Sequence, residues 1–308
     1  MKWWMRPLVR LMVAILLPFL VPALVAGALW ALPGDPVSIL CPPGSCEGWE
    51  ELARIWHLDH GPMYFYYWWI WNAMSLDFGT SWSVISGVPV YDEIVASIPH
   101  TAALVVCAMA PLFFGTVAAA LGWLPRWLDP FWQLIGMVPA VILALLAAAY
   151  VEIRFGVVFN DWRPLLWKIG LGALVLGVAD GALAGAIIGT RSVFEEEVKQ
   201  RYIQIAQLRG ETTLSNALPN VLPSMIGQFR GRVLHVISGT VVVEVVLGIP
   251  GLGDLLWRGT LTQDFPIILA AAFVIALVSG GMMLLQALSE IGIAMYVRRS
   301  PPGVVGGG

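Results

Sequence analysis

Long uncharged stretches dominate the chain, and they recur at a length that suits membrane-crossing helices. Four of them contain no charged residue: Leu11–Leu32, Thr101–Leu124, Pro130–Val151 and Phe265–Ser289. A bilayer core about 30 Å thick is spanned by about 20 residues of α-helix. The pattern therefore predicts a transmembrane helix in each of these stretches.

Two further apolar stretches contain charged or titratable residues near their middle. Ile169–Thr190 carries Asp180, and Val233–Ile249 carries His235 and Glu244. An intramembrane charge rarely faces lipid, so we expect these two spans to face protein or water. Together the six stretches predict an all-α polytopic membrane protein with six transmembrane helices.

The basic residues of the connecting segments predict how these helices are oriented, because cytoplasmic loops carry an excess of Lys and Arg. One side would hold ten of them: Lys2, Arg6, Arg10, Arg126, Arg191, Lys199, Arg201, Arg209, Arg298 and Arg299. The other side would hold five: Arg54, Arg154, Arg163, Lys168 and Arg258. This distribution predicts that both termini are cytoplasmic.

Composition agrees with a membrane location and excludes several other classes of protein. The 308 residues are 58% hydrophobic and 12% charged, with a net charge of −3, which is far from the balance of a soluble domain and offers no basic patch for nucleic acid. No metal-binding spacing, nucleophile motif or phosphate-binding loop occurs. We therefore expect a non-enzymatic membrane protein with no catalytic residue, cofactor or metal site, whose ATP chemistry, if used, comes from another chain.

The segment 33–99, after the first predicted span, is the longest external connection. Glu47–Asp59 has apolar residues at helical spacing, and Met63–Trp71 is crowded with Tyr and Trp. Such surfaces settle at membrane interfaces, so an interfacial anchor is one interpretation and a platform on which substrate stacks is the other. Cys41 and Cys46 flank a short turn and are candidates for a disulfide, which external conditions permit.

Several short sequence strings, taken in order, identify a family. The first half contains Leu32–Pro36, Leu76–Ser81 and Ile98–Thr101, and the second half contains Tyr202, Ala206, Gly210, Leu218–Asn220, Gly239, Glu244, Pro250–Gly253 and Asp264–Pro266. With this order and spacing the chain resembles the permease subunits of the dipeptide, oligopeptide and nickel ABC importers, specifically the first of their two permeases. The resemblance covers nearly the whole chain.

The resemblance implies a type I-like ABC importer permease fold and a set of partners. It implies a first helix within 1–32, an external insertion 33–99, a permease core 100–297 with a cytoplasmic coupling segment 190–217, and a cytoplasmic tail 298–308. The partners would be a second permease, two ATP-binding subunits, an external substrate-binding protein and the lipid bilayer of the bacterial inner membrane, with no nucleic acid.

Within the coupling segment, the resemblance assigns contact with the ATPase to Tyr202, Ala206 and Gly210. Small residues four apart let a partner approach one helix face, and an aromatic residue can anchor an interface. The alternative is an ordinary helix that Gly210 terminates. The chain is about one helical turn shorter than usual between Gly210 and Leu218, which makes Leu214 a second position for the contact.

The remaining candidates concern the external mouth and the pathway. Pro250, Gly251, Leu252 and Gly253 predict a tightly shaped loop near the external mouth, in which the two glycines adopt backbone angles that other residues avoid, with a plain connection as the alternative. Candidates for the pathway are Asp180, Arg230, Arg232, His235 and Glu244. We expect Asp180 to face inward and to pair with an Arg or with a backbone donor. For Glu244 the alternative to a pathway role is a structural role beside this loop. The alternative for Arg230, Arg232 and His235 is that their side chains snorkel to the cytoplasmic surface. The predicted function is ATP-driven uptake of a peptide, metal chelate or opine. An exporter permease and a non-transporting scaffold are the alternatives.

Overall fold

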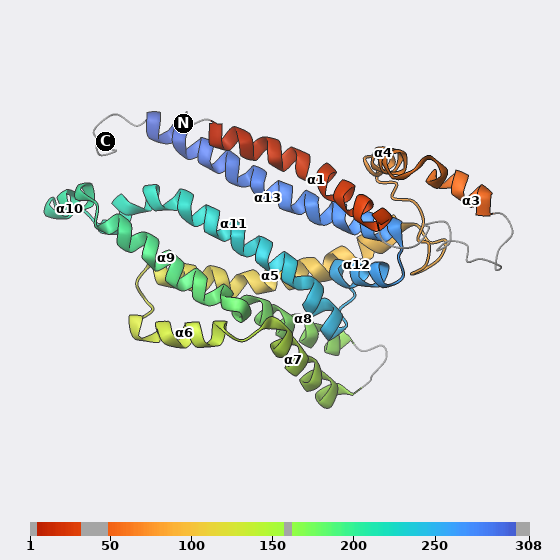
Figure 1. Cartoon of the computed structure of the whole chain (residues 1–308). Helices are drawn as coiled ribbons and strands as arrows, with labels where there is room; N and C mark the ends of the chain where they lie inside the picture. Colours follow the sequence, from red (N-terminus) through yellow and green to blue (C-terminus); the bar gives the residue numbers. More distant parts are fainter. Residues whose placement is uncertain (1–4, 32–48, 157–161, 300–308) are drawn as a thin grey trace. The chain divides into compact units, whose positions relative to one another are not determined.

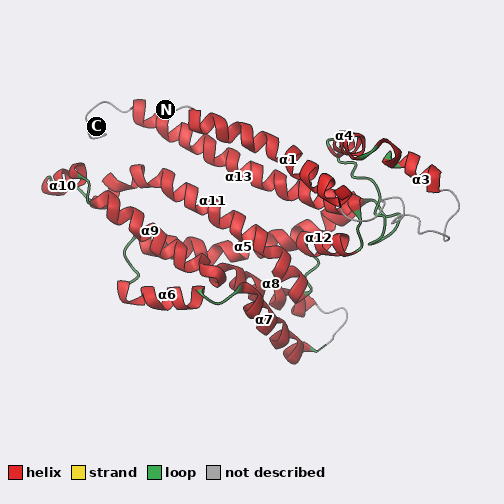
Figure 2. Cartoon of the chain, in the orientation of Figure 1, coloured by secondary structure: helices red, strands yellow, loops and turns green. Residues whose placement is uncertain are grey.

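The computed structural model describes residues 5–31, 49–156 and 162–299. In these ranges the chain is helical apart from turns and one isolated bridge between Thr80 and Pro89 (Figure 2). The predicted all-α membrane fold is therefore confirmed. Cys41 and Cys46 lie outside the described residues.

The number of membrane spans depends on how two bent pairs of helices are counted. Four helical stretches are long and apolar enough to cross a bilayer: Leu8–Ala31, Val90–Ala120, Pro164–Val198 and Phe265–Ser289. Two more candidates are Arg126–Gly136 with Ala140–Phe155, bent by 77°, and Asn220–Leu247 with Leu252–Leu261, bent by 72°. The described residues thus provide four spans, or six if each bent pair is one span.

The chain divides into two compact units, each built from separate stretches of sequence (Figure 1). The first unit takes residues 1–12, 103–249 and 281–308, and the second takes 13–102 and 250–280. The second unit thus combines the expected external insertion with most of the first helix and the start of the last.

The first unit is a packed set of helices. It contains most of α5 (Val90–Ala120), then η2 (Arg126–Leu128), α6 (Asp129–Gly136), α7 (Ala140–Phe155), α8 (Trp162–Val178), η3 (Ala179–Gly181), α9 (Ala182–Val198), α10 (Arg201–Leu208) and α11 (Thr213–Leu247). Glycines let these helices approach closely, as is common in membranes. A Cβ added to Gly172 of α8 would lie 2.8 Å from Val243 of α11, and one added to Gly177 would lie 3.1 Å from the carbonyl oxygen of Ala108 in α5.

The expected helix Pro130–Val151 is broken, which corrects the prediction of one continuous span. The chain leaves α6 at Gly136 and begins α7 after Pro139, whose backbone is extended (φ −61°, ψ 139°). A proline cannot donate the helical hydrogen bond and disfavours helical backbone at the residue before it. The two helices therefore meet at a sharp angle although the stretch is apolar throughout.

The second unit has a core of aromatic side chains. It contains residues 13–31 of α1 (Met5–Ala31), α3 (Trp49–Ile55), η1 (Leu58–His60), α4 (Pro62–Ala73), the start of α5, α12 (Leu252–Leu261) and the first half of α13 (Phe265–Arg299). Phe65 and Trp69 of α4 are buried with Trp82 and Phe265, and the rings of the last two stack 5.3 Å apart. Residues 49–99 are thus a folded part of the protein.

Within this unit α1 lies beside α13 (Figure 1). Pro18 of α1 has no N–H, so the carbonyl oxygen of Ala14 loses its usual helical donor. Gly280 of α13 lies against that carbonyl, and a Cβ at this glycine would come within 2.6 Å of the oxygen. Gly281 has nothing within 4 Å of its Cβ position.

These two adjacent glycines provide a matched test of the contact. Gly280→Ala should destabilise the protein by about 1–3 kcal/mol, because the methyl group would meet backbone that cannot rotate away. Gly281→Ala should be neutral or slightly stabilising, since alanine favours helix over glycine. Thermal unfolding of both variants in detergent measures the difference, and equal midpoints would contradict the close packing of α1 on α13.

Candidate functional site

The helix expected to couple the chain to an ATPase is present as α10. It is a short helix between α9 and α11, and it ends at a glycine cap. Gly210 has φ +80°, the N–H of Glu211 donates to the carbonyl of Ala206, and the N–H of Gly210 donates to the carbonyl of Gln207. These two bonds form a Schellman cap, which requires left-handed backbone and so favours glycine. Within the chain, Gly210 ends the helix, and its Cβ position meets nothing within 4 Å.

One face of α10 packs on the chain itself. Ile203 is fully buried beside Ala217 and Val221 of α11. Ala206 lies on the same face and is only 6% exposed. This differs from the expectation that Ala206 offers its small side chain to a partner, because the chain already covers it. The spacing of four places Tyr202 and Ala206 on one face of α10, but Gly210 lies beyond the end of the helix, and the spacing does not indicate which way that face points.

Tyr202 joins three helices through its hydroxyl group. The hydroxyl donates to the carboxylate of Glu197 at the end of α9 and accepts a hydrogen bond of 2.6 Å from Nδ2 of Asn220 in α11. Burial, followed by the bond to Glu197, raises the pKa of the Tyr202 hydroxyl above its ordinary value. The residue therefore stays protonated and holds α10 in place from the inside.

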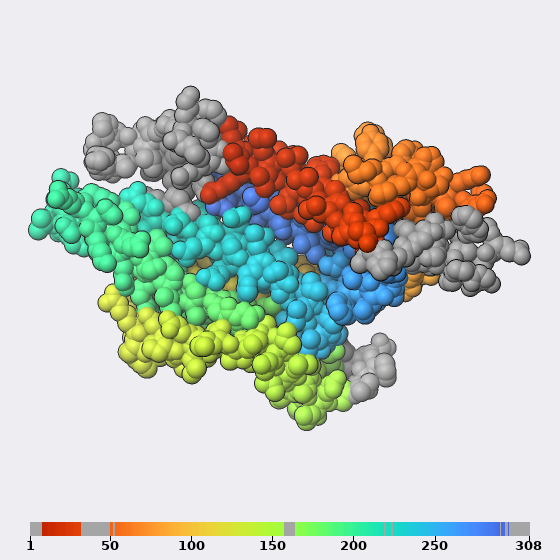
Figure 3. Space-filling view, viewed as in Figure 1, coloured from red at the N-terminus to blue at the C-terminus, as the bar shows by residue number. Residues whose placement is uncertain are grey.

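The outer face of α10 carries two uncovered apolar side chains among polar ones. Leu208 is 88% exposed and Ile205 is 50% exposed, and Gln204 beside them is also exposed. In the space-filling view the outer side of this segment is open (Figure 3). An exposed leucine and isoleucine on a helix otherwise fastened by a cap and buried contacts are typical of a surface that a partner covers.

Leu214 lies beside a cleft of about 680 Å³ in the first unit. The cleft is bordered by the connection between α5 and η2 and by the end of α9, with Arg126 and Lys199 among its lining residues. Arg126 forms an ion pair of 2.5 Å with Glu195 of α9. Arg191 of α9 binds both carboxylate oxygens of Asp129, at 2.5 and 2.6 Å. These contacts fasten the α5–α6 connection to the end of the helix that leads into α10.

Two polar residues of α11, Gln228 and Arg232, lie along a row of glycines in α9. A Cβ at Gly185 would overlap the guanidinium group of Arg232, and one at Gly189 would lie 3.1 Å from the side-chain oxygen of Gln228. Arg230 is half-buried, and its Nε has no hydrogen-bond partner among the described residues. His235 is exposed. Only the glycine row therefore leaves room for the long side chain of Arg232 between the two helices.

Asp180 interrupts the predicted span Ile169–Thr190 and caps a different helix. Its backbone is left-handed (φ 51°), which breaks the run between α8 and α9. Its N–H donates to the carbonyl of Val138 at 3.3 Å, and its carboxylate accepts the N–H of Ala140 at 3.2 Å. A carboxylate at the first turn of α7 is favoured by the helix dipole. Of the two partners expected for Asp180, an Arg or a backbone donor, the structure shows the backbone donor.

Glu244 is fully buried near the end of α11, and its carbonyl accepts the N–H of Ile249 at 2.9 Å. The left-handed residue at this end is Gly248 (φ 61°), whereas Gly251 has φ −104° and Gly253 lies inside α12. The expectation that Gly251 and Gly253 supply unusual backbone angles is therefore wrong.

In the second unit the loop Pro250–Gly253 is held by a side chain of α5. The N–H of Leu252 donates to the hydroxyl of Thr101 at 2.7 Å. Gly251 and Gly253 are buried, as is Leu252. The loop is thus tightly packed, as its composition predicted.

Asp264 is a buried acidic residue to which sequence reasoning assigned no role. Oδ2 accepts hydrogen bonds from the hydroxyl of Ser81 (2.6 Å) and from the N–H groups of Ser83 (2.9 Å) and Val84 (3.1 Å). The backbone carbonyl of Asp264 accepts the N–H of Ile268, so the residue also begins α13. One carboxylate therefore holds the loop before α5 onto the start of the last helix.

The described residues contain no group of three or more His, Cys, Asp or Glu placed to bind a metal ion. Cys107 is a free, exposed cysteine in α5. Neither observation adds a chemical site to the surfaces described above.

Residues 111–294 match a family described as "Binding-protein-dependent transport system inner membrane component". The chain is 29% identical over 275 residues to the glutathione transport system permease protein GsiC of Shigella boydii serotype 4 (strain Sb227), covering 84% of this chain and 87% of that protein. The proteins of the same name from Escherichia coli (strain K12) and Shigella dysenteriae serotype 1 (strain Sd197) match to the same extent. The matched family region includes α10, α11 and α12.

Proposed function

Because this chain belongs to the family of inner-membrane components of binding-protein-dependent transport systems, and so is the permease subunit of an ABC transporter, we propose that it forms half of a pathway for uptake of a peptide or related small solute. Relatives named as glutathione transport permeases favour a small peptide over a metal chelate or an opine. The family depends on a binding protein, which favours import over export and over a scaffold role.

The proposed complex contains a second permease, two ATP-binding subunits and an external substrate-binding protein. The chain carries no phosphate-binding loop, so the free energy of ATP hydrolysis must reach it through a non-covalent contact. We place both termini and α10 in the cytoplasm, in line with the distribution of Lys and Arg.

The single observation that carries the proposal is the construction of α10. Its inner side is fixed by Ile203, Ala206 and the bonds of Tyr202, while Ile205 and Leu208 face outward and are exposed among the described residues. A rigid helix with an apolar outer face can transmit a push from an ATPase to α9 and α11. Gly210 contributes by ending the helix sharply, and Leu214 by bordering the adjacent cleft.

We assign the pathway to the polar stretch 230–235 of α11 and its neighbours. Arg230, Arg232 and His235 lie in one stretch of this helix, and Arg232 is held against Gly185 of α9. Cations in this position would attract the carboxylate that every unblocked peptide carries. Asp180 and Glu244 have structural parts in this arrangement, as the cap of α7 and as a buried residue at the end of α11.

Arg230→Gln combined with Arg232→Gln should lower uptake of an anionic or zwitterionic peptide at least tenfold, because the cations that attract its carboxylate are lost. The ATP-binding subunits should stay bound, since α10 is unchanged. Uptake of radiolabelled glutathione and of a dipeptide into proteoliposomes containing the whole transporter, with its binding protein, measures this effect.

Arg154→Gln, an exposed change at the end of α7, is the control and should leave uptake unchanged. Normal uptake in the double variant would remove the two arginines from the pathway. Transport that needs no binding protein, or that runs outward, would support the exporter alternative instead.

A further inference from the structure

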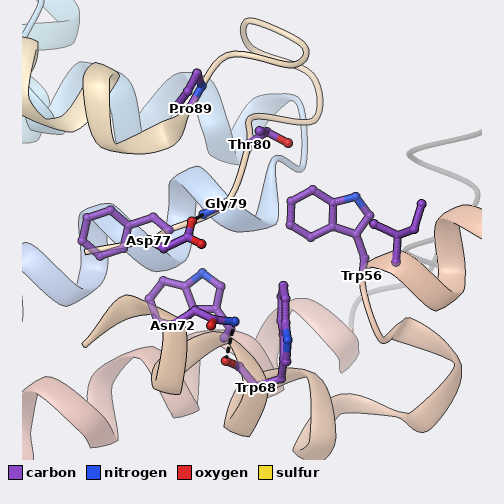
Figure 4. A pocket seen from close by; sticks show the side chains of 10 residues that line it. Trp56, Trp68, Asn72, Asp77, Gly79, Thr80 and Pro89 are labelled. Carbon is purple, nitrogen blue, oxygen red and sulfur yellow. Dashed lines mark hydrogen bonds between the residues drawn. The ribbon is translucent and has the colours of Figure 1, made fainter. Parts of the chain in front are cut away.

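A pocket in the second unit lies between α3, α4 and the start of α5, apart from the surfaces described above. Its volume is about 360 Å³, which is within the range of sites for small molecules or single side chains. Its walls include three tryptophans, Trp56, Trp68 and Trp69, together with Asp77. Figure 4 shows the carboxylate of Asp77 across an open space from the rings of Trp56 and Trp68.

The aromatic walls of this pocket are fixed in position. The rings of Trp56 and Trp68 meet nearly at right angles, with centroids 6.3 Å apart. Gly79 lies directly against the Trp56 ring, where a Cβ would come within 2.9 Å of it, and its φ of +81° also requires glycine. The chain therefore presents two aromatic side chains that meet in a corner, and the pocket lies beside them.

The charge of the pocket is negative. Asp77 is oriented by a hydrogen bond of 3.0 Å from the N–H of Gly79 to its Oδ1, and it is exposed. The described residues that line the pocket include no lysine, arginine or histidine. A carboxylate beside the faces of tryptophans attracts organic cations, through both the charge and the ring quadrupoles.

We propose that this pocket binds an alkylguanidinium or alkylammonium group, with the cation held between Trp56, Trp68 and Asp77 and its alkyl stem against the apolar wall. Two sources supply such a group: an Arg or Lys side chain of the external binding protein, or a cationic group of the cargo. Only this choice of source rests on the proposed function. Binding of the cation itself depends on the pocket alone.

The first test uses the purified transporter in detergent with n-butylguanidinium as the probe and uncharged n-butylurea, of similar shape, as its match. Saturation-transfer NMR titration should give a Kd on the order of 1 mM for the cation and binding about tenfold weaker for the urea. Asp77→Asn keeps an oxygen for the N–H of Gly79 and removes the charge, so it should weaken the cation about fivefold.

Asp92→Asn is the matched control, because it removes an exposed acid at the start of α5 that does not line the pocket. Trp56→Leu should abolish the preference for the cation. If that variant is misfolded, the Asp77 and Asp92 pair still decides the outcome. Equal binding of the two probes, or equal effects of the two aspartate variants, would overturn the proposal.

A second measurement distinguishes the sources. If the group belongs to the binding protein, Asp77→Asn should weaken docking of that protein and lower uptake of neutral and cationic cargo alike. If it belongs to the cargo, docking should be unchanged and KM should rise for cationic cargo only. No change in either quantity would overturn a role in transport. The proposed function would fail on a different result: the unaltered protein would show neither uptake nor binding of the ATPase.

Discussion

Leu208→Glu is expected to release the ATP-binding subunits from the permease and to abolish uptake, with the chain still inserted in the membrane. Leu208 is the most exposed apolar residue of α10, and buried contacts on the opposite side of the helix hold α10 in place. A central apolar residue of an interface contributes about 2 kcal/mol or more, which corresponds to about 30-fold in affinity. Affinity purification of the permease, followed by quantification of the ATPase that stays bound, measures the loss.

Gln204→Glu is the matched control for this change. It adds the same charge to the same helix but leaves Ile205 and Leu208 in place. The control should retain the ATPase and uptake. Retention of the ATPase by Leu208→Glu would show that α10 does not dock through this face. Leu214→Glu would then test whether the contact lies at the adjacent cleft.

Asp264→Ala is expected to lower the stability of the second unit by about 3 kcal/mol. The substitution leaves the hydroxyl of Ser81 and the N–H groups of Ser83 and Val84 without their acceptor in a buried site, and hydrogen bonds to a charged group contribute about 1.5–3 kcal/mol each, without simple additivity. The loop before α5 should become accessible to protease. Thermal unfolding in detergent and limited proteolysis measure the two effects.

Ser86→Ala is the control for the loop, because it removes a single part-buried hydrogen bond, from the Ser86 hydroxyl to the carbonyl of Trp82. It should change the unfolding midpoint little. Asp264→Asn keeps the volume of the side chain and should fall between the two. An Asp264→Ala variant as stable and as protease-resistant as Ser86→Ala would show that the loop is held by its aromatic contacts alone.

The sequence predicted the helices well where hydrophobicity decides their place, and less well where backbone geometry does. The apolar run Pro130–Val151 was long enough for one span, but Pro139 divides it into two helices. Hydropathy does not reveal such a break, because one proline in an apolar run barely changes the mean hydropathy of that run. Asp180 was recognised as an unusual charge, yet its left-handed backbone and its capping of α7 depend on a residue forty positions away.

The candidate site shows the same division. The spacing of Tyr202, Ala206 and Gly210 placed a helix correctly, since periodicity is local information. Which face meets a partner depends on what α9 and α11 cover, and that is set by tertiary packing. Asp264 had no local signal for its role, because its main partner, Ser81, lies 183 positions earlier in the chain.

The division of the second unit into two stretches affects how the protein is made. Residues 13–102 leave the ribosome first, but their aromatic core also needs 250–280, and residues 103–249 must be synthesised in between. At about 5–20 residues per second this delay is about 7–30 s. During it, the loop of Ser81 has no Asp264, and α1 has no Gly280 to lie against. A nascent permease therefore carries an unfinished second unit until translation is nearly complete, which leaves the apolar surface of that unit open to proteases and chaperones.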